Sequence, residues 1–246
     1  MNPENTSSGI MSAELASLSR TVVSCRLCPR LVRYREDVAR TRKREFADWT
    51  YWGRPVPGLG DPQAELLIVG LAPAAHGANR TGRMFTGDSS GRWLFRALHR
   101  AGFANQPASE HRDDGLQLSN VYITATVRCA PPDNRPAPRE IVTCARYLRS
   151  ELELLTRVRV ILALGQVAFT HILALAAERG FVVPRPRPKF THGASYLLPS
   201  AAGGTLRLIA SFHPSRQNTQ TGKLTEAMLD AVFTDARRLL GELVRG

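Results

Sequence analysis

Short apolar runs alternate with longer amphipathic segments along most of this chain, and this alternation constrains the fold more than any other feature of the sequence. Residues 65–69 and 158–164 have the length and composition of buried strands. Residues 118–127 and 206–211 predict two further strands. The remaining segments predict helices, at 90–101, 137–155, 166–179 and 222–243. Strands that alternate with helices of this length indicate an α/β protein whose parallel sheet is covered on both faces.

The N-terminal part departs from this regular pattern. Residues 1–12 are polar and turn-prone, so we expect a disordered tail there. A helical pattern follows from 13 to 43, interrupted at Pro29, and residues 50–62 contain too much Pro and Gly for a regular element. A chain of 246 residues is long enough to close one sizeable core, so we expect a single domain over residues 13–246.

The chain is strongly basic. Its 33 Lys and Arg residues exceed its 21 Asp and Glu residues, which gives a formal net charge of +12 and a pI near 10.5. Such a protein suits a polyanionic partner, nucleic acid before all others. An anionic membrane is the rival partner, but the one dense basic run, at 40–44, adjoins no apolar anchor. No membrane span or signal peptide is recognisable, so we expect a cytoplasmic protein, associated with the nucleoid where its polyanionic partner is DNA.

The four cysteines form a second informative pattern. Cys25 and Cys28 make a C-x2-C pair, and Cys129 and Cys144 lie about a hundred residues later with fourteen residues between them. In a reducing compartment such a set is more typical of metal ligands than of disulfides. Four thiolates complete either a zinc site or a [4Fe-4S] cluster, and the wide second pair favours the cluster, since zinc sites usually have two tight pairs. Four unrelated buried thiols are the alternative without a metal.

Two loops lie where a parallel sheet binds its ligands, beyond the carboxyl ends of strands. They are residues 70–91, GLAPAAHGANRTGRMFTGDSSG, and residues 213–223, HPSRQNTQTGK. Together with RCAPPDNRP at 128–136, they closely resemble the signatures of family 5 uracil-DNA glycosylases, the UDGb type. The cysteine pattern is similar to that of the iron-sulfur members of this superfamily. The resemblance runs from about Cys25 to the last predicted helix.

The resemblance implies a fold, a reaction and a partner. The fold is a three-layer α/β/α sandwich with a central four-stranded, mainly parallel sheet. The reaction is hydrolysis of the N-glycosidic bond of uracil, or of another deaminated base such as hypoxanthine, flipped out of double-stranded DNA to leave an abasic site in base excision repair. The four cysteines then hold a [4Fe-4S] cluster of structural role. Glycosylases of this size can act alone on DNA, so we expect a monomer.

Base release requires a group that positions water and a donor that stabilises the departing base. Relatives in other families carry a carboxylate or amide at the positions of Leu71 and Ala72, whose side chains cannot activate water. Asp88 is the candidate for positioning or deprotonating the water, and an N-cap or turn role is its alternative. Asn134 can help to hold that water or serve as an ordinary turn amide. His213, at a predicted strand end, can donate a hydrogen bond to the base carbonyl or be satisfied by backbone groups.

The flipped base also needs a pocket. Phe85 is the candidate stacking partner, with plain core packing as its alternative. Asn120 can read a Watson-Crick edge, as the matching asparagine does in related glycosylases, or only cap its loop. Further candidates for substrate binding lie in the two loops, and each is equally typical of a solvated surface. These are Gly70, Ala72, His76, Arg80 and Ser215.

Other interpretations stay open on the sequence alone. A non-catalytic nucleic-acid-binding module with an iron-sulfur centre is the alternative from another class, and hypoxanthine or thymine opposite guanine are rival specificities. Residues 87–91 match the G-x-S-x-G motif of acyl hydrolases, but that nucleophile must follow a strand directly and a long loop precedes it here. The proline-rich stretch 181–189 is either a stiff connection or a loop that touches the DNA backbone.

Overall fold

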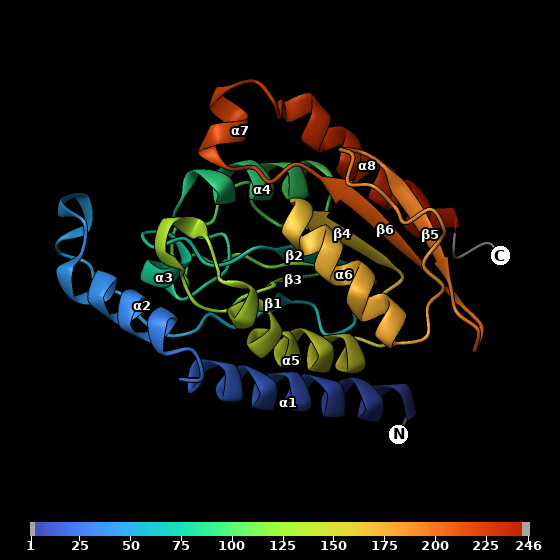
Figure 1. Cartoon of the computed structure of the whole chain (residues 1–246), viewed down its shortest axis with the longest axis horizontal. Helices are drawn as coiled ribbons and strands as arrows, with labels where there is room; N and C mark the ends of the chain where they lie inside the picture. The colour runs from blue at the N-terminus through green and yellow to red at the C-terminus, as the bar shows by residue number, and fades with distance from the viewer. Residues whose placement is uncertain (1–2, 243–246) are drawn as a thin grey trace.

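A computed structural model describes residues 3–242 and shows a six-stranded sheet between two layers of helices (Figure 1). The order of strands across the sheet is β1-β3-β2-β4-β6-β5. Their bounds are β1 (Leu59–Gly60), β2 (Leu66–Gly70), β3 (Val121–Ala125), β4 (Val160–Leu164), β5 (Ser195–Pro199) and β6 (Thr205–Ser211).

The four inner strands, β3, β2, β4 and β6, pair in parallel. β2, β3 and β4 are buried along their whole length, because helices cover both faces of the sheet. The predicted α/β class and parallel sheet are therefore confirmed. The predicted number of strands is wrong, since the whole sheet has six strands rather than four.

The two additional strands are antiparallel edges. β1 pairs with β3, and β5 pairs with β6. β1 has only 2 residues and lies in the segment rich in Pro and Gly. In β5, only Leu198 is buried. Neither edge therefore carries the fully apolar run by which the inner strands are recognised in a sequence.

The helices form the two outer layers. Leu66 and Ile68 of β2 face a core shared with α4 and α8, whereas Leu67 and Val69 face a core shared with α5 and α6. This alternation follows the period of two along a strand. The bounds are α1 (Pro3–Val23), α2 (Pro29–Thr41), α3 (Ala78–Thr81), α4 (Ser89–Arg100), α5 (Pro138–Leu154), α6 (Gln166–Glu178), α7 (Arg216–Gln220) and α8 (Glu226–Glu242), with short 3-10 helices η1 (Arg44–Phe46) and η2 (Pro132–Asn134).

The helix α1 lies along the outside of α5 (Figure 1). It begins at Pro3, within the stretch 1–12 for which we expected a disordered tail. The helical pattern that buries Leu15 and Val22 continues back through that stretch, because extending a formed helix is far easier than starting one. Residues 1–2 of the expected tail lie outside the described residues. Among the described helices, none is long and apolar enough to cross a bilayer.

The carboxyl ends of the four parallel strands meet at one edge of the sheet, on the side of α3 and α7 in Figure 1. Gly70 at the end of β2 pairs with Ala125 at the end of β3, and Leu164 of β4 pairs with Ser211 of β6. The segments that follow these strands therefore come together there. Both loops that were predicted to bind ligand begin at this edge.

Candidate functional site

Phe85 and His213 form the centre of the site at this edge. Their rings stack, with centroids 5.8 Å apart and an interplanar angle of 29°. Phe85 has a φ of 53°, which is rare for a large side chain. Its ring lies so close to Gly70 that a Cβ added there would come within 2.7 Å of Phe85 Cζ. Glycine at the end of β2 is therefore required, and the half-buried Phe85 ring keeps surface on which a base can stack.

His213 follows β6 and is held by its backbone. Its carbonyl oxygen accepts hydrogen bonds from Asn218 Nδ2 and from the backbone N–H of Ser215, both at 2.8 Å. Burial lowers the pKa of His213 to about 4, so the imidazole is neutral near pH 7. The Ser215 hydroxyl accepts from the Asn218 N–H at 3.4 Å and caps α7, which makes it part of the support for His213.

Asp88 is the N-cap of α4. Its Oδ1 accepts a hydrogen bond from the backbone N–H of Gly91 at 2.9 Å. Its Oδ2 lies against Gly77, where an added Cβ would come within 2.1 Å of that oxygen. Burial raises the pKa of Asp88, although the backbone N–H groups of Gly91 and Ser90 act in the opposite direction. The N-cap interpretation is therefore confirmed, and it leaves the second carboxylate oxygen at the loop of the candidate site.

Asn134 ends η2, in the segment that follows β3 at the same edge of the sheet. It is exposed and has a φ of 55°. The Arg30 guanidinium donates to the carbonyl of Arg135 at 3.1 Å and so anchors this segment to α2. The role of Asn134 in holding water stays a prediction, and its exposure at the active edge is compatible with it.

Asn120 lies at the opposite end of the sheet, just before β3 begins. Its Oδ1 accepts from the backbone N–H of Glu65 at 2.8 Å, and its Nδ2 donates to Glu65 Oε2 at 3.0 Å. It ties the starts of β2 and β3 together, so the predicted role in reading the base is wrong and the loop-capping alternative is right. The residue that ends β3 beside Gly70 is Ala125, which has no polar side chain.

Three residues of the first loop are less accessible than the sequence suggested. Arg80 is 3% exposed and bonds to carbonyls inside the loop, so its predicted direct contact with substrate is wrong. His76 is half-buried, and its Nδ1 is hydrogen-bonded to the Tyr51 hydroxyl at 3.0 Å. Ala72 packs against the hydrophobic cluster that contains two of the cysteines. The loop is therefore an internally bonded structure rather than a flexible surface segment.

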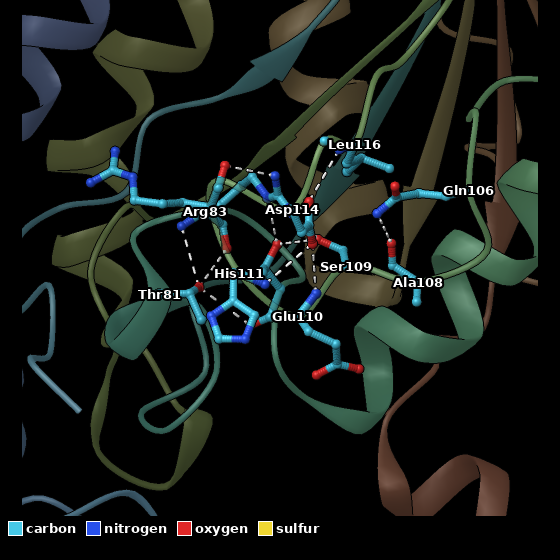
Figure 2. A network of polar contacts seen from close by, with 12 residues as sticks. Thr81, Arg83, Gln106, Ala108, Ser109, Glu110, His111, Asp114 and Leu116 are labelled. Carbon is cyan, nitrogen blue, oxygen red and sulfur yellow. Dashed lines mark hydrogen bonds and ion pairs between the residues drawn. The ribbon is translucent and has the colours of Figure 1, made fainter. Parts of the chain in front are cut away.

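A second polar network fixes this loop from outside (Figure 2). Arg83 Nη2 donates to Asp114 Oδ1 and to Ser109 Oγ, both at 2.6 Å. The other oxygen of Asp114 accepts from the backbone N–H groups of Glu110 at 2.8 Å and His111 at 3.2 Å. The network joins residues 109–114 to the segment that carries Phe85.

The four cysteines converge on one small pocket behind this edge. Cys25 lies between α1 and α2, Cys28 is the N-cap of α2, Cys129 follows β3 and Cys144 lies on α5. Cys129 and Cys144 are buried, and the other two cysteines are half-buried. Arg35 of α2 donates from Nη1 to Cys129 Sγ at 3.0 Å. Segments far apart in the sequence therefore bring all four thiols together.

Burial raises the pKa values of the two buried thiols in this pocket. Burial raises the pKa of Cys129 to about 11 and that of Cys144 to about 12. The backbone N–H of Arg128 donates to Cys144 Sγ at 3.3 Å. Within residues 3–242, no group of three or more His, Cys, Asp or Glu side chains is arranged to hold a metal ion. The pocket brings the four thiols together in a buried setting.

Two residues that support the site were not predicted from the sequence. Arg35 is 2% exposed and lies on the same face of α2 as buried Leu31. A charged residue at an apolar position of a helix is a recognisable signal of a buried polar contact. Tyr51 is the partner of His76, but it lies in the segment rich in Pro and Gly, where no periodicity indicates what is buried.

Known proteins resemble this chain in sequence over most of its length. The sequence model of the uracil DNA glycosylase superfamily matches residues 57–237. The chain is 50% identical over 231 residues to a type-5 uracil-DNA glycosylase of Mycobacterium tuberculosis, covering 94% of this chain and 83% of the relative. It is 53% identical over 222 residues to that of Thermus thermophilus, covering 90% and 96%. A type-4 uracil-DNA glycosylase of Archaeoglobus fulgidus is 29% identical over 202 residues, covering 82% and 81%.

Proposed function

This chain belongs to the uracil DNA glycosylase superfamily, and we infer from that premise that it is a DNA-repair enzyme that removes uracil from DNA. The structural observation that carries the mechanism is the stacked pair of Phe85 and His213 beside the loop of Asp88. These groups meet at the carboxyl edge of a parallel sheet, where such folds bind their ligands.

The uracil, flipped out of the duplex, stacks on Phe85. An aromatic face stabilises a base that has lost its neighbours in the helix. Gly70 allows the ring to reach its position, and the left-handed backbone at Phe85 fixes it there. The base then lies next to the His213 imidazole, which is within stacking distance of the same ring.

The reaction needs one water molecule and two side-chain roles. Asp88 orients the water and accepts its proton while the oxygen attacks the sugar carbon. Asn134, on the neighbouring loop, helps to hold that water. The bond between sugar and base breaks, and its electron pair stays with the uracil. Neutral His213 donates a hydrogen bond to the carbonyl on which that negative charge develops. The proton taken up by Asp88 passes through solvent to the uracil anion, and the products are free uracil and an abasic site.

We also propose a base specificity broader than uracil alone, with hypoxanthine as a second substrate and double-stranded DNA as the context. The supporting observation is that Ala125 ends β3 beside Gly70, so no side-chain amide reads the base from that strand end. Leu71 and Ala72 likewise offer no polar side chain. A pocket that recognises bases through stacking and backbone groups discriminates less than one that uses a bidentate amide. The protein has the size to act on DNA as a monomer.

The cysteine pocket fits an iron-sulfur cluster as its proposed group. Four thiolates complete either a zinc site or a [4Fe-4S] cluster, and the wide spacing of Cys129 and Cys144 in the sequence favours the cluster, since zinc sites usually have two tight pairs. Cys25, Cys28, Cys129 and Cys144 would hold it, with hydrogen bonds to sulfur of the kind that stabilise such clusters. When bound, it supplies a structural cross-link between α2, the segment after β3 and α5.

The decisive experiment is incubation of the protein with duplex oligonucleotides that carry uracil or hypoxanthine, followed by alkaline cleavage, with iron content and visible absorbance measured on the same sample. Asp88→Asn and His213→Ala test the active site. Asp113→Asn and His99→Gln are matched controls, because both residues are exposed. We expect cleavage by the wild type and both controls, and loss of cleavage in both active-site variants.

Other outcomes separate the alternatives. A brown protein that binds DNA without cleaving it would identify a non-catalytic binding module. Cleavage that persists in Asp88→Asn would remove this carboxylate from the reaction. Zinc in place of iron and sulfide would overturn the cluster and leave the glycosylase assignment intact.

A further inference from the structure

Arg80 joins the two ends of the loop that carries Asp88. Its Nε donates to the carbonyl of His76 at 2.8 Å, and its Nη2 donates to the carbonyl of Gly87 at 2.7 Å. His76 precedes Gly77, and Gly87 precedes Asp88. One guanidinium therefore holds the residues on either side of the contact between Asp88 Oδ2 and Gly77.

Two glycines make this arrangement possible. At Gly87, where φ is +75°, an added Cβ would come within 2.5 Å of Arg80 Nη2. At Gly77, an added Cβ would come within 2.1 Å of Asp88 Oδ2. Side chains at either position would separate the guanidinium, the loop backbone and the carboxylate. The loop therefore depends on close approach of Arg80 at one end and of Asp88 at the other.

Among residues 3–242, no carboxylate forms an ion pair with Arg80. Its guanidinium lies 3.9 Å from the ring centroid of Phe46 and 4.0 Å from that of Trp49. Within the described part of the chain its side chain is 3% exposed, and Nη1 has no hydrogen-bond partner. Aromatic faces stabilise a cation without cancelling its charge. A buried, poorly screened positive charge thus remains beside the active-site loop.

The charges around Asp88 and Arg80 come from several elements. Burial raises the pKa of Asp88, while Arg92 on the same helix and Arg80 on α3 lower it. Arg80 is faced by Glu45 from η1, Glu110 from the loop before β3, Tyr51 and Asp88 itself. Burial lowers the pKa of His76, and the nearby charges of Lys43 and Arg80 lower it further, while Glu45 raises it.

We propose that Arg80 is a positioning residue for base release: its two hydrogen bonds fix the segment that presents Asp88, and its charge favours the ionised carboxylate that accepts the proton of water. This inference rests on the proposed role of Asp88. It also changes the interpretation of the first loop, in which the arginine acts on a carboxylate instead of on DNA.

The test is the pH dependence of single-turnover uracil release in duplex DNA for Arg80→Gln, Arg80→Lys and Arg83→Gln. Arg80→Gln removes both the positive charge and the pair of hydrogen bonds to the His76 and Gly87 carbonyls. We expect its maximal rate to fall roughly 10²-fold and its acidic limb to move to higher pH, because Asp88 loses a neighbouring cation. Arg80→Lys keeps a charge but cannot bond both carbonyls in the same way, so its rate falls while its acidic limb stays near that of the wild type.

Arg83→Gln is the matched control. It removes another set of guanidinium hydrogen bonds in the same loop. The partners of Arg83 are Asp114, Ser109, the Thr86 hydroxyl and the Arg112 carbonyl, and not the His76 and Gly87 carbonyls that Arg80 binds. Its acidic limb should therefore not move, even if its rate falls. Thermal unfolding of each variant establishes that it is folded. If Arg80→Gln does not fold, a wild-type rate in folded Arg80→Lys overturns the proposal.

The outcomes separate this proposal from the function itself. A folded Arg80→Gln whose acidic limb matches the wild type, or an equal shift in Arg83→Gln, overturns the role of Arg80 while Asp88→Asn remains inactive. Absence of uracil release by the wild type overturns both.

Discussion

Arg128 and Glu151 form an ion pair inside the protein, with 1% and 2% of their side chains exposed. Arg128 follows β3 and Glu151 lies on α5. Glu151 Oε2 also accepts from the hydroxyl of Thr124 at 2.7 Å. Because the backbone N–H of Arg128 donates to Cys144 Sγ, this pair links the sheet, α5 and the cysteine pocket at one point.

Glu151→Gln should destabilise the protein strongly. It leaves the Arg128 guanidinium buried without a counter-charge, which typically lowers the free energy of unfolding by about 3–5 kcal/mol. Urea unfolding at neutral pH measures the change. Glu178→Gln is the control, because it breaks the exposed pair with Arg149 and should change the free energy of unfolding little. Equal losses in the two variants would contradict the structural importance of the buried pair.

Phe85→Ala should weaken base release by removal of the stacking surface. Stacking of a base on an aromatic side chain contributes about 1–3 kcal/mol, so kcat/KM for uracil DNA should fall accordingly. Gly70→Ala should act in the same direction, because its Cβ displaces the Phe85 ring. Gly9→Ala, which has nothing within 4 Å of the added Cβ, should behave as the wild type. Unchanged kcat/KM in both Phe85→Ala and Gly70→Ala would show that the base stacks elsewhere.

His213 should remain neutral throughout the range in which the enzyme works. Its folded pKa is lowered to about 4, below the usual value, so NMR titration of its ring protons should show no midpoint near pH 6–7. As pH falls, His213 takes up a proton in the unfolded chain before it does so in the folded protein. The residue therefore lowers the free energy of unfolding progressively below about pH 6.5. His213→Gln should reduce this pH dependence in urea unfolding. A titration midpoint near 6.5 would contradict the lowering of the His213 pKa by burial.

Asp114 should give the opposite pH dependence of stability. Burial raises its pKa, but Arg83 and the backbone N–H groups of Glu110, Leu116 and His111 outweigh it and hold the value at about 2. The contribution is fully present above the unfolded pKa and disappears as pH falls through about 2. It amounts to about 1–2 kcal/mol, and Asp114→Asn should remove it at pH 7. Asp113→Asn, at an exposed neighbour, should change the free energy of unfolding little; equal losses would contradict the network of Figure 2.

The layered fold was predictable because its inner strands are buried on both faces and therefore appear as apolar runs. β2 and β4 start within two residues of their predicted positions. β5 escaped prediction because only one of its side chains is buried, and β1 because two residues carry no periodicity. An edge strand forms because it pairs with a neighbouring strand in space, and the local sequence carries no signal of that pairing.

Site residues could be predicted from the sequence where a motif lies at a strand end. They could not be predicted where the burial of a side chain determines its role. Phe85, Asp88 and His213 lie at the predicted edge. Asn120 was misassigned because its role was taken from the resemblance, although it lies near the start of its strand and therefore at the end of the sheet opposite the carboxyl edge. Arg80 was expected at the surface because a loop arginine usually is, and only the fold shows the two aromatic rings around it.

Arg35 of α2 contacts both the cysteine pocket and the loop of residues 70–91. The Arg35 guanidinium bonds to Cys129 Sγ and to the Cys25 carbonyl, while its own carbonyl accepts from Asn79 Nδ2 in the active-site loop at 3.2 Å. Asn79 is fully buried, so this contact has no solvent to replace it. The cysteine pocket and the loop of residues 70–91 are therefore mechanically coupled through Arg35, so a change in packing on one side of α2 displaces the groups on the other side as well.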